Sequence, residues 1–312
     1  MASPLLVAIA GGDATAILTA ARLLAERLDG APEIVAVNEL VPIHPAPDSM
    51  DALPPELYAA QRRRLQDAVL RSVHAAHDVG LTWPLDVVDG QPARTIARLA
   101  RERRVRMIVM GIGRHTPMDR IFGSETALQT LRVADRPVLA VAPGFAALPR
   151  RAVVAVDFSP ASVRAAEEAL ALLADRGTLS LVYVRPPADV LLRLGDETLS
   201  WMHGERVTEL FARLVAALDV PPSVSVEPQV LAGDPADQLL DLAERQGADL
   251  IATGSSGLGF FNRLIVGSVA TRLLRRATVS VLAVPRPSAA DVERIERLLS
   301  STTESSEAAR WP

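Results

Sequence analysis

A glycine-rich stretch in the second half of the chain carries the strongest chemical signal of the sequence. It reads TGSSGLGFFNRLIVGSVATRLLRR, from Thr253 to Arg276. Glycines that follow a strand tolerate positive φ, and without a Cβ they let phosphate oxygens approach backbone N–H groups. A helix that begins at Gly267-Ser268 would point its unsatisfied N–H groups and its positive dipole end at the same place. The pattern favours an anion pocket, and the alternative is a connecting loop in which Ser268 simply caps the helix.

The elements that would position this loop belong to an internal repeat. VVDGQPARTIARLARERRVRMIVMG, which begins at Val87, returns as VLAGDPADQLLDLAERQGADLIATG at Val230, 143 residues further on. The openings and the ends of the copies also correspond: LLVAIAGGDATA at Leu5 with AVVAVDFSPASV at Ala152, and PVLAVAP at Pro137 with SVLAVPR at Ser280. We therefore expect one domain in residues 1–143 and a second in 151–286, joined by a linker that contains proline and glycine.

Within each copy, short β-branched runs alternate with longer Ala- and Leu-rich runs of helical period, which is typical of βαβ units. The strands expected in the second copy are 152–156, 179–184, 224–231, 250–253 and 279–284, and the helices are 160–176, 197–217, 235–246 and 267–276. Strands that are apolar on both faces indicate helices on both sides of the sheet. The prediction is an α/β protein of two tandem, doubly wound, Rossmann-like domains. Each has a five-stranded parallel sheet and a ligand crevice at the carboxyl ends of its strands. Residues 287–312 should add a C-terminal helix over 291–299 and a disordered end.

Composition narrows the possible partners. The formal net charge is -4 and the pI about 5.8, so neither nucleic acid nor an anionic membrane surface is an expected partner. Cysteine is absent, which excludes disulfides and Cys-ligated metals, and no lysine is present to serve a Walker-A loop. The amino terminus resembles a first strand more than a signal peptide, and a cytoplasmic location is expected.

Gly254, Gly257 and Gly267-Ser268 fit the G-x2-G-x9-G-(S/T) motif of nucleotide-binding universal stress proteins without gaps. VAVDFSPAS, residues 154–162, resembles the first strand of that family, and VLAGDPADQLLDLA resembles its third-strand turn and helix. The resemblance extends over both halves to about residue 286. It implies the adenine nucleotide alpha hydrolase-like fold, binding of ATP, AMP or ADP with Mg, dimeric assembly and no established turnover.

The resemblance also implies roles for individual residues. Asp157, preceded by Ala155 and Val156, matches the acid at the end of the first strand, which contacts the adenosine end of the nucleotide. Val184 matches the apolar residue that packs against adenine. The positions that match the phosphate and ribose loop and the helix start are Thr253, Gly254, Ser256, Gly257, Gly267, Ser268 and Val269. Thr253 departs from the family, where an apolar residue is common. Asp157 could instead cap the following helix, although Ser159 beside Pro160 is better placed to do so.

The first copy has a damaged version of this motif. Ala10 stands where Asp157 stands in the second copy, and only one residue separates Gly111 from Gly113. Asp13 is displaced by three residues and fits a helix cap better than a ligand contact. One nucleotide per chain, in the second domain, is therefore expected.

Other functions have weaker support. His74 and His77 could face one metal ion, but no third ligand is within sequence reach, so a solvated helix face is favoured, as it is for Arg62, Arg63 and Arg64. No general base is identifiable, so an ATPase would at most be slow. The main alternative to a nucleotide-binding stress or regulatory protein is a nucleotide-independent interaction module. We also expect the two copies to form an intramolecular pseudo-dimer through their fifth strands, with a homodimer as a further assembly.

Overall fold

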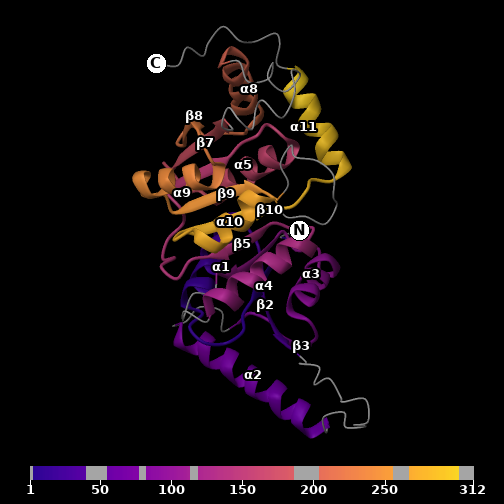
Figure 1. The fold of residues 1–312 in the computed structure, drawn as a ribbon. Helices are drawn as coiled ribbons and strands as arrows, with labels where there is room; N and C mark the ends of the chain where they lie inside the picture. The colour runs from indigo at the N-terminus through magenta and orange to yellow at the C-terminus, as the bar shows by residue number, and fades with distance from the viewer. Residues whose placement is uncertain are drawn as a thin grey trace, which may run out of the picture. The chain divides into compact units, whose positions relative to one another are not determined.

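A computed structural model of the chain describes residues 3–39, 55–76, 82–112, 119–185, 204–255 and 267–301 (Figure 1). The chain divides into two compact units, Met1–Leu148 and Pro149–Pro312. The predicted helix 197–217 begins outside the described residues, because 197–203 are not among them.

The first unit alternates strands and helices. Its elements are β1 (Leu5–Ala8), α1 (Thr15–Leu28), β2 (Pro32–Asn38), α2 (Pro55–Ala75), β3 (Leu85–Asp89), α3 (Pro92–Glu102), β4 (Met107–Gly111), α4 (Asp119–Val133) and β5 (Val138–Val141). Its strands lie in the order β3-β2-β1-β4-β5, and the paired neighbours are parallel.

The second unit repeats this plan and adds a helix. Its described elements are β6 (Arg151–Ala155), α5 (Pro160–Leu172), β7 (Thr178–Arg185), α8 (Gly204–Ala217), β8 (Ser225–Ala232), α9 (Pro235–Gln246), β9 (Leu250–Gly254), α10 (Ser268–Arg276), β10 (Ser280–Val284) and α11 (Ala289–Ser301). The strands lie in the equivalent order, β8-β7-β6-β9-β10, and are again parallel. Two tandem α/β domains with parallel sheets are thereby confirmed.

Helices cover both faces of the second sheet. Ser180 of β7 contacts Gln246 of α9, whereas Tyr183 belongs to an aromatic cluster with Phe211 of α8. Since side chains alternate along a strand, α8 and α9 lie on opposite faces. α5 packs on β6, β9 and β10, and α10 packs on α9. The winding changes direction between β6 and β9, which is where ligands bind in sheets of this kind.

Two expectations from the sequence are wrong. The expectation that strands are apolar on both faces fits the central strands. It does not fit β8, an edge strand whose residues are largely half-buried or exposed. α5 ends at Leu172 and not near residue 176, because Leu173 is extended at ψ 143 and Ala174 donates to Pro149 O. The chain then turns through Arg176, at φ 62.

α11 follows β10 and belongs to the second unit, where it contacts α5 and α8. It is longer than the predicted helix 291–299, and Ile295 on its inner face is fully buried. Ser288 begins the helix with a reciprocal cap, since Asp291 N donates to Ser288 Oγ at 3.2 Å while that hydroxyl donates to Asp291 Oδ2 at 2.8 Å.

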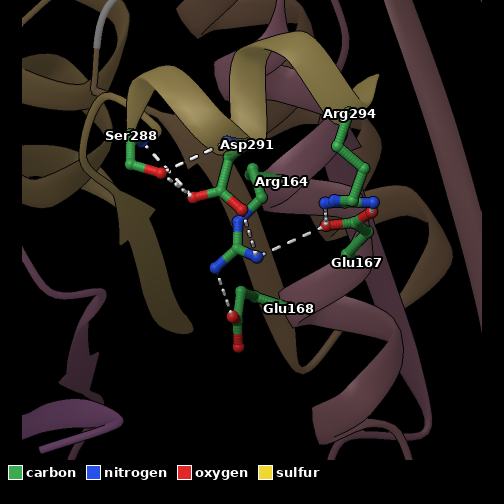
Figure 2. A network of polar contacts seen from close by, with 6 residues as sticks. All are labelled: Arg164, Glu167, Glu168, Ser288, Asp291 and Arg294. Atoms are coloured by element: carbon green, nitrogen blue, oxygen red, sulfur yellow. Dashed lines mark hydrogen bonds and ion pairs between the residues drawn. The ribbon is translucent and has the colours of Figure 1, made fainter. Parts of the chain in front are cut away.

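Ion pairs join α11 to α5 (Figure 2). Arg294 donates two hydrogen bonds to Glu167, at 2.9 and 3.0 Å. Arg164 lies between three carboxylates, 3.0 Å from Glu168, 3.6 Å from Glu167 and 3.8 Å from Asp291. An apolar anchor and a charged rim therefore hold the added helix against α5.

No helix in the described ranges combines the length and the apolar character that crossing a membrane requires.

Candidate functional site

The predicted ligand residues of the second copy gather at the carboxyl edge of its sheet. Parallel pairing aligns Val154 of β6 with Ala252 of β9, and Ala155 with Val182 of β7. The same registers bring Asp157 to the edge between Val184 and the end of β9. Four of the predicted positions therefore lie at the carboxyl edge on either side of the point where the winding changes direction: Val156, Asp157, Val184 and Gly254.

The turn from β6 into α5 holds the carboxylate of Asp157. Its Oδ1 accepts hydrogen bonds from Ser159 N at 3.0 Å and from Ser159 Oγ at 2.6 Å. Ser159 is the N-cap of α5, and its side chain accepts from Ser162 N. This confirms that the serine and not the aspartate caps the helix. The two hydrogen bonds from Ser159 fix the orientation of the Asp157 carboxylate at the carboxyl end of β6.

An aromatic cluster that no sequence pattern predicted supports this turn. Phe158 has φ 60, and its ring packs 5.4 Å from that of Tyr183 and 5.1 Å from that of Phe211. A left-handed conformation is costly for an aromatic residue and is maintained only where the surroundings impose it. Burial raises the pKa of Tyr183, and the negative charge of Asp157 adds to this effect while Arg185 opposes it. A phenylalanine directly after the strand-terminal acid was the available signal.

Gly254 is required by packing. A Cβ at this position would lie 2.9 Å from Ala161 Cβ and 3.0 Å from its carbonyl carbon, so only glycine lets α5 approach the end of β9 this closely. The neighbouring Thr253 is buried, and its hydroxyl donates to Gly254 O at 3.0 Å. That local bond explains how a polar side chain occupies a position that is commonly apolar.

The start of α10 contradicts the alternative interpretation of the loop, in which Ser268 caps the helix. The N-cap is Gly267, which makes no side-chain hydrogen bond, and Ser268 is the first helical residue and exposed. The idea that Ser268 caps the helix is therefore wrong. Gly267 N donates to Ser255 O at 2.7 Å, which ties the helix start to the end of β9, and Val269 follows half-buried. Ser256 and Gly257 lie outside the described residues.

The equivalent turn of the first copy contacts its own helix. Gly11 and Gly12 have φ 95 and 81, and a Cβ on Gly11 would lie 3.2 Å from Ala68 Cβ of α2. Ser72 of α2 also donates to Gly12 O. Ala10 offers no carboxylate. Asp13 accepts from Thr15 N at 3.0 Å, so it serves the start of α1, although the N-cap residue itself is Ala14.

The metal alternative gains no support. Among the residues that the structure describes, no group of three His, Asp or Glu side chains could hold a metal ion. His74 is exposed, and its ring nitrogen lies 2.6 Å from Leu70 O. His77 is outside the described ranges, so the structure does not place the second histidine of the pair. Arg62, Arg63 and Arg64 are exposed, as expected, and Arg62 donates to Val87 O.

Comparisons with known proteins agree with this architecture. The model of the Universal stress protein family matches residues 1–142 and 149–285. A universal stress protein of Mycobacterium tuberculosis is 32% identical over 213 residues, which cover 64% of this chain and 65% of that protein. One from Methanocaldococcus jannaschii is 28% identical over 142 residues, 44% of this chain and 83% of that protein.

One solved structure shares this fold over most of the chain, and another is similar over less than half of it. A universal stress protein of Archaeoglobus fulgidus covers 92% of this chain and 97% of its own, with a TM-score of 0.59 and 21% identity. A universal stress protein solved in complex with cAMP covers 44% of this chain, with a TM-score of 0.32 and 28% identity. Since both halves of the chain match the family and fold in the same strand order, the chain belongs to the universal stress protein family, with two tandem copies of its domain.

Proposed function

We propose that the second domain binds an adenine nucleotide, ATP, ADP or AMP, with Mg, and that nucleotide occupancy regulates what the protein contacts during a stress response. The observation that carries this proposal is the uncapped start of α10, tied by Gly267 to the end of β9 and preceded by the complete G-x2-G-x9-G-S spacing. A helix start without an acidic first turn favours anions through its free N–H groups and its dipole.

The proposed roles follow from positions at the sheet edge. Asp157 faces the adenosine end of the nucleotide, and Ala155 and Val156 precede it in the strand. Val184 packs against the base. Thr253, Gly254, Ser256 and Gly257 form the ribose and phosphate loop. The N–H groups of Ser268 and Val269 receive the phosphates, while Gly267, whose own N–H is bonded to Ser255 O, lets them approach without a Cβ in the way. Mg balances the remaining phosphate charge.

Isothermal titration calorimetry of the full chain with ATP and Mg tests this proposal. We expect one site per chain, a strong loss of affinity in Asp157→Asn, and no change in Asp13→Asn of the first copy. Nucleotide extracted from the purified protein and identified by chromatography gives an independent measurement. Two equivalent sites per chain would contradict the assignment to the second domain, and no binding at all would refute the proposal.

A nucleotide-independent interaction module is the second candidate. The observation that favours it is the first copy, where Ala10 replaces the carboxylate of Asp157 and only one residue separates Gly111 from Gly113. If the protein purifies without nucleotide and ATP does not bind, this candidate replaces the first. Slow ATP hydrolysis ranks third, because the sequence offers no identifiable general base.

We also propose that the two copies pair through β5 and β10 as an intramolecular pseudo-dimer in the cytoplasm, and that two chains assemble further into a homodimer. Each of these strands ends the strand order of its own unit, and an edge strand requires a partner or protection. Covalent linkage raises the effective concentration of the two edges to about the millimolar range. Hydrogen exchange protection of β5 and β10 should therefore be independent of protein concentration. Protection that disappears on dilution would indicate pairing between chains.

A further inference from the structure

A four-residue ionic cluster joins α9 to α10 in the second domain. Arg272 of α10 donates from Nη1 to Asp234 Oδ2 at 2.6 Å and from Nη2 to Asp237 Oδ1 at 2.9 Å. Arg276, one turn further along α10, also donates to Asp237. Asp234 is at the same time the N-cap of α9, since its Oδ1 accepts from Asp237 N at 3.1 Å. One carboxylate therefore both starts α9 and holds α10.

The place of Arg272 on α10 connects this cluster with the proposed phosphate site. Arg272 follows Ser268 by four residues, so the two lie on one face of the helix, about 6 Å apart along its axis. α10 has only nine residues. Its start is tied to β9 through Gly267 and Ser255, and Arg272 supplies a second attachment, to α9. Two attachments set the direction in which the first N–H groups of the helix point.

The cluster also balances charge beside the site. Two carboxylates close to a phosphate-binding helix start would repel a nucleotide, and two guanidinium groups neutralise them. The hydrogen bond from Arg276, and the one from Arg272, lower the pKa of Asp237 against the opposing effect of burial. About a third of the Arg272 side chain is exposed, and nearly half of each aspartate. Ion pairs this exposed contribute little to folding stability, so their removal leaves the fold intact.

The first copy lacks this cluster. At the equivalent positions, 143 residues earlier, Gln91 and Arg94 replace the two aspartates, and Gln129 replaces Arg272. Gln91 is the N-cap of α3 but makes no side-chain capping bond. The cluster therefore accompanies the copy that has the complete glycine spacing.

We propose that Arg272 is a positioning residue of the nucleotide site, which acts through Asp234 and Asp237 to orient the amino end of α10 toward the phosphates. This inference rests on the proposed nucleotide function. It assigns to Arg272 a contribution to phosphate binding and none to recognition of the base.

The test compares ATP with adenosine by calorimetry of the full chain with Mg, in wild type and Arg272→Gln. We expect the affinity for ATP to fall about fivefold to tenfold, the size of a helix-end and charge effect over about 10 Å, while adenosine affinity stays within about twofold. The matched control is Arg276→Gln, which loses a bond to the same Asp237 one turn further from the site. It should change ATP affinity by less than about twofold.

The outcomes separate the two proposals. An unchanged ATP affinity in Arg272→Gln, or equal losses for ATP and adenosine, would overturn the positioning role while the nucleotide function stands. An equal loss in Arg276→Gln would show that charge anywhere on α10 matters, which also overturns it. A wild-type protein that binds neither ATP nor adenosine removes the nucleotide function and this inference with it.

Discussion

Replacing Gly254 by alanine should destabilise the second domain, because its hydrogen occupies the space where α5 meets β9. The new methyl group would lie 2.9 Å from Ala161 Cβ and 3.0 Å from the Ala161 carbonyl carbon. Backbone must then move, and overpacking of this kind costs about 1–3 kcal/mol. The reduced entropy of the unfolded chain returns about 0.4–1 kcal/mol. The net loss is about 1–2 kcal/mol, equivalent to roughly 2–8 °C in Tm for a domain of this size.

Differential scanning calorimetry of the full chain measures this change, and Gly144→Ala is the matched control. A Cβ on Gly144 meets nothing within 4 Å, so that variant should unfold at the wild-type temperature or slightly above it. If Gly254→Ala is as stable as Gly144→Ala, the close approach of α5 does not explain the glycine. The requirement for glycine would then have to come from the ligand alone.

Three further predictions concern the second domain. Ile295→Ala should lower the free energy of unfolding by about 2–4 kcal/mol. Arg294→Ala removes two hydrogen bonds to α5 and should lower it by at most about 1 kcal/mol. Urea titration ranks the two variants, and the reverse order would show that ion pairs dominate the docking of α11. The pKa of Asp291 lies below its ordinary value, chiefly through the hydrogen bond from Ser288. The stability that Asp291 contributes is therefore complete above about pH 4 and is lost as the pH falls through the lowered pKa of the folded state. Asp291→Asn should weaken the loss of unfolding free energy at acid pH, and an unchanged loss would contradict the assignment. Arg176→Gly should raise Tm, because a left-handed arginine carries about 1 kcal/mol of strain; a lower Tm would show that its side chain matters more.

The sequence predicted the architecture because architecture is encoded locally and, here, twice. Alternation of β-branched and helical runs located the strands of the second copy within about one residue of β6, β7, β8, β9 and β10. The Ser159-Pro160 pair predicted the start of α5 correctly, since capping depends on neighbours in sequence. The glycine spacing alone did not predict that Asp157 lies near Gly254. That prediction required the repeat, because the repeat implied the parallel strand order that places the ends of β6 and β9 side by side.

Tertiary contacts decided the remaining features, because they join residues far apart in the sequence. α5 stops at Leu172 where Ala174 bonds to Pro149, and no local signal marks that position. Gly254 is a glycine on account of Ala161, 93 residues earlier, and α11 is fixed by side chains of α5. Periodicity and motif spacing therefore determine which elements form and which residues could meet a ligand. Only packing determines where a helix ends, which glycine is indispensable and what holds the start of α10 in place.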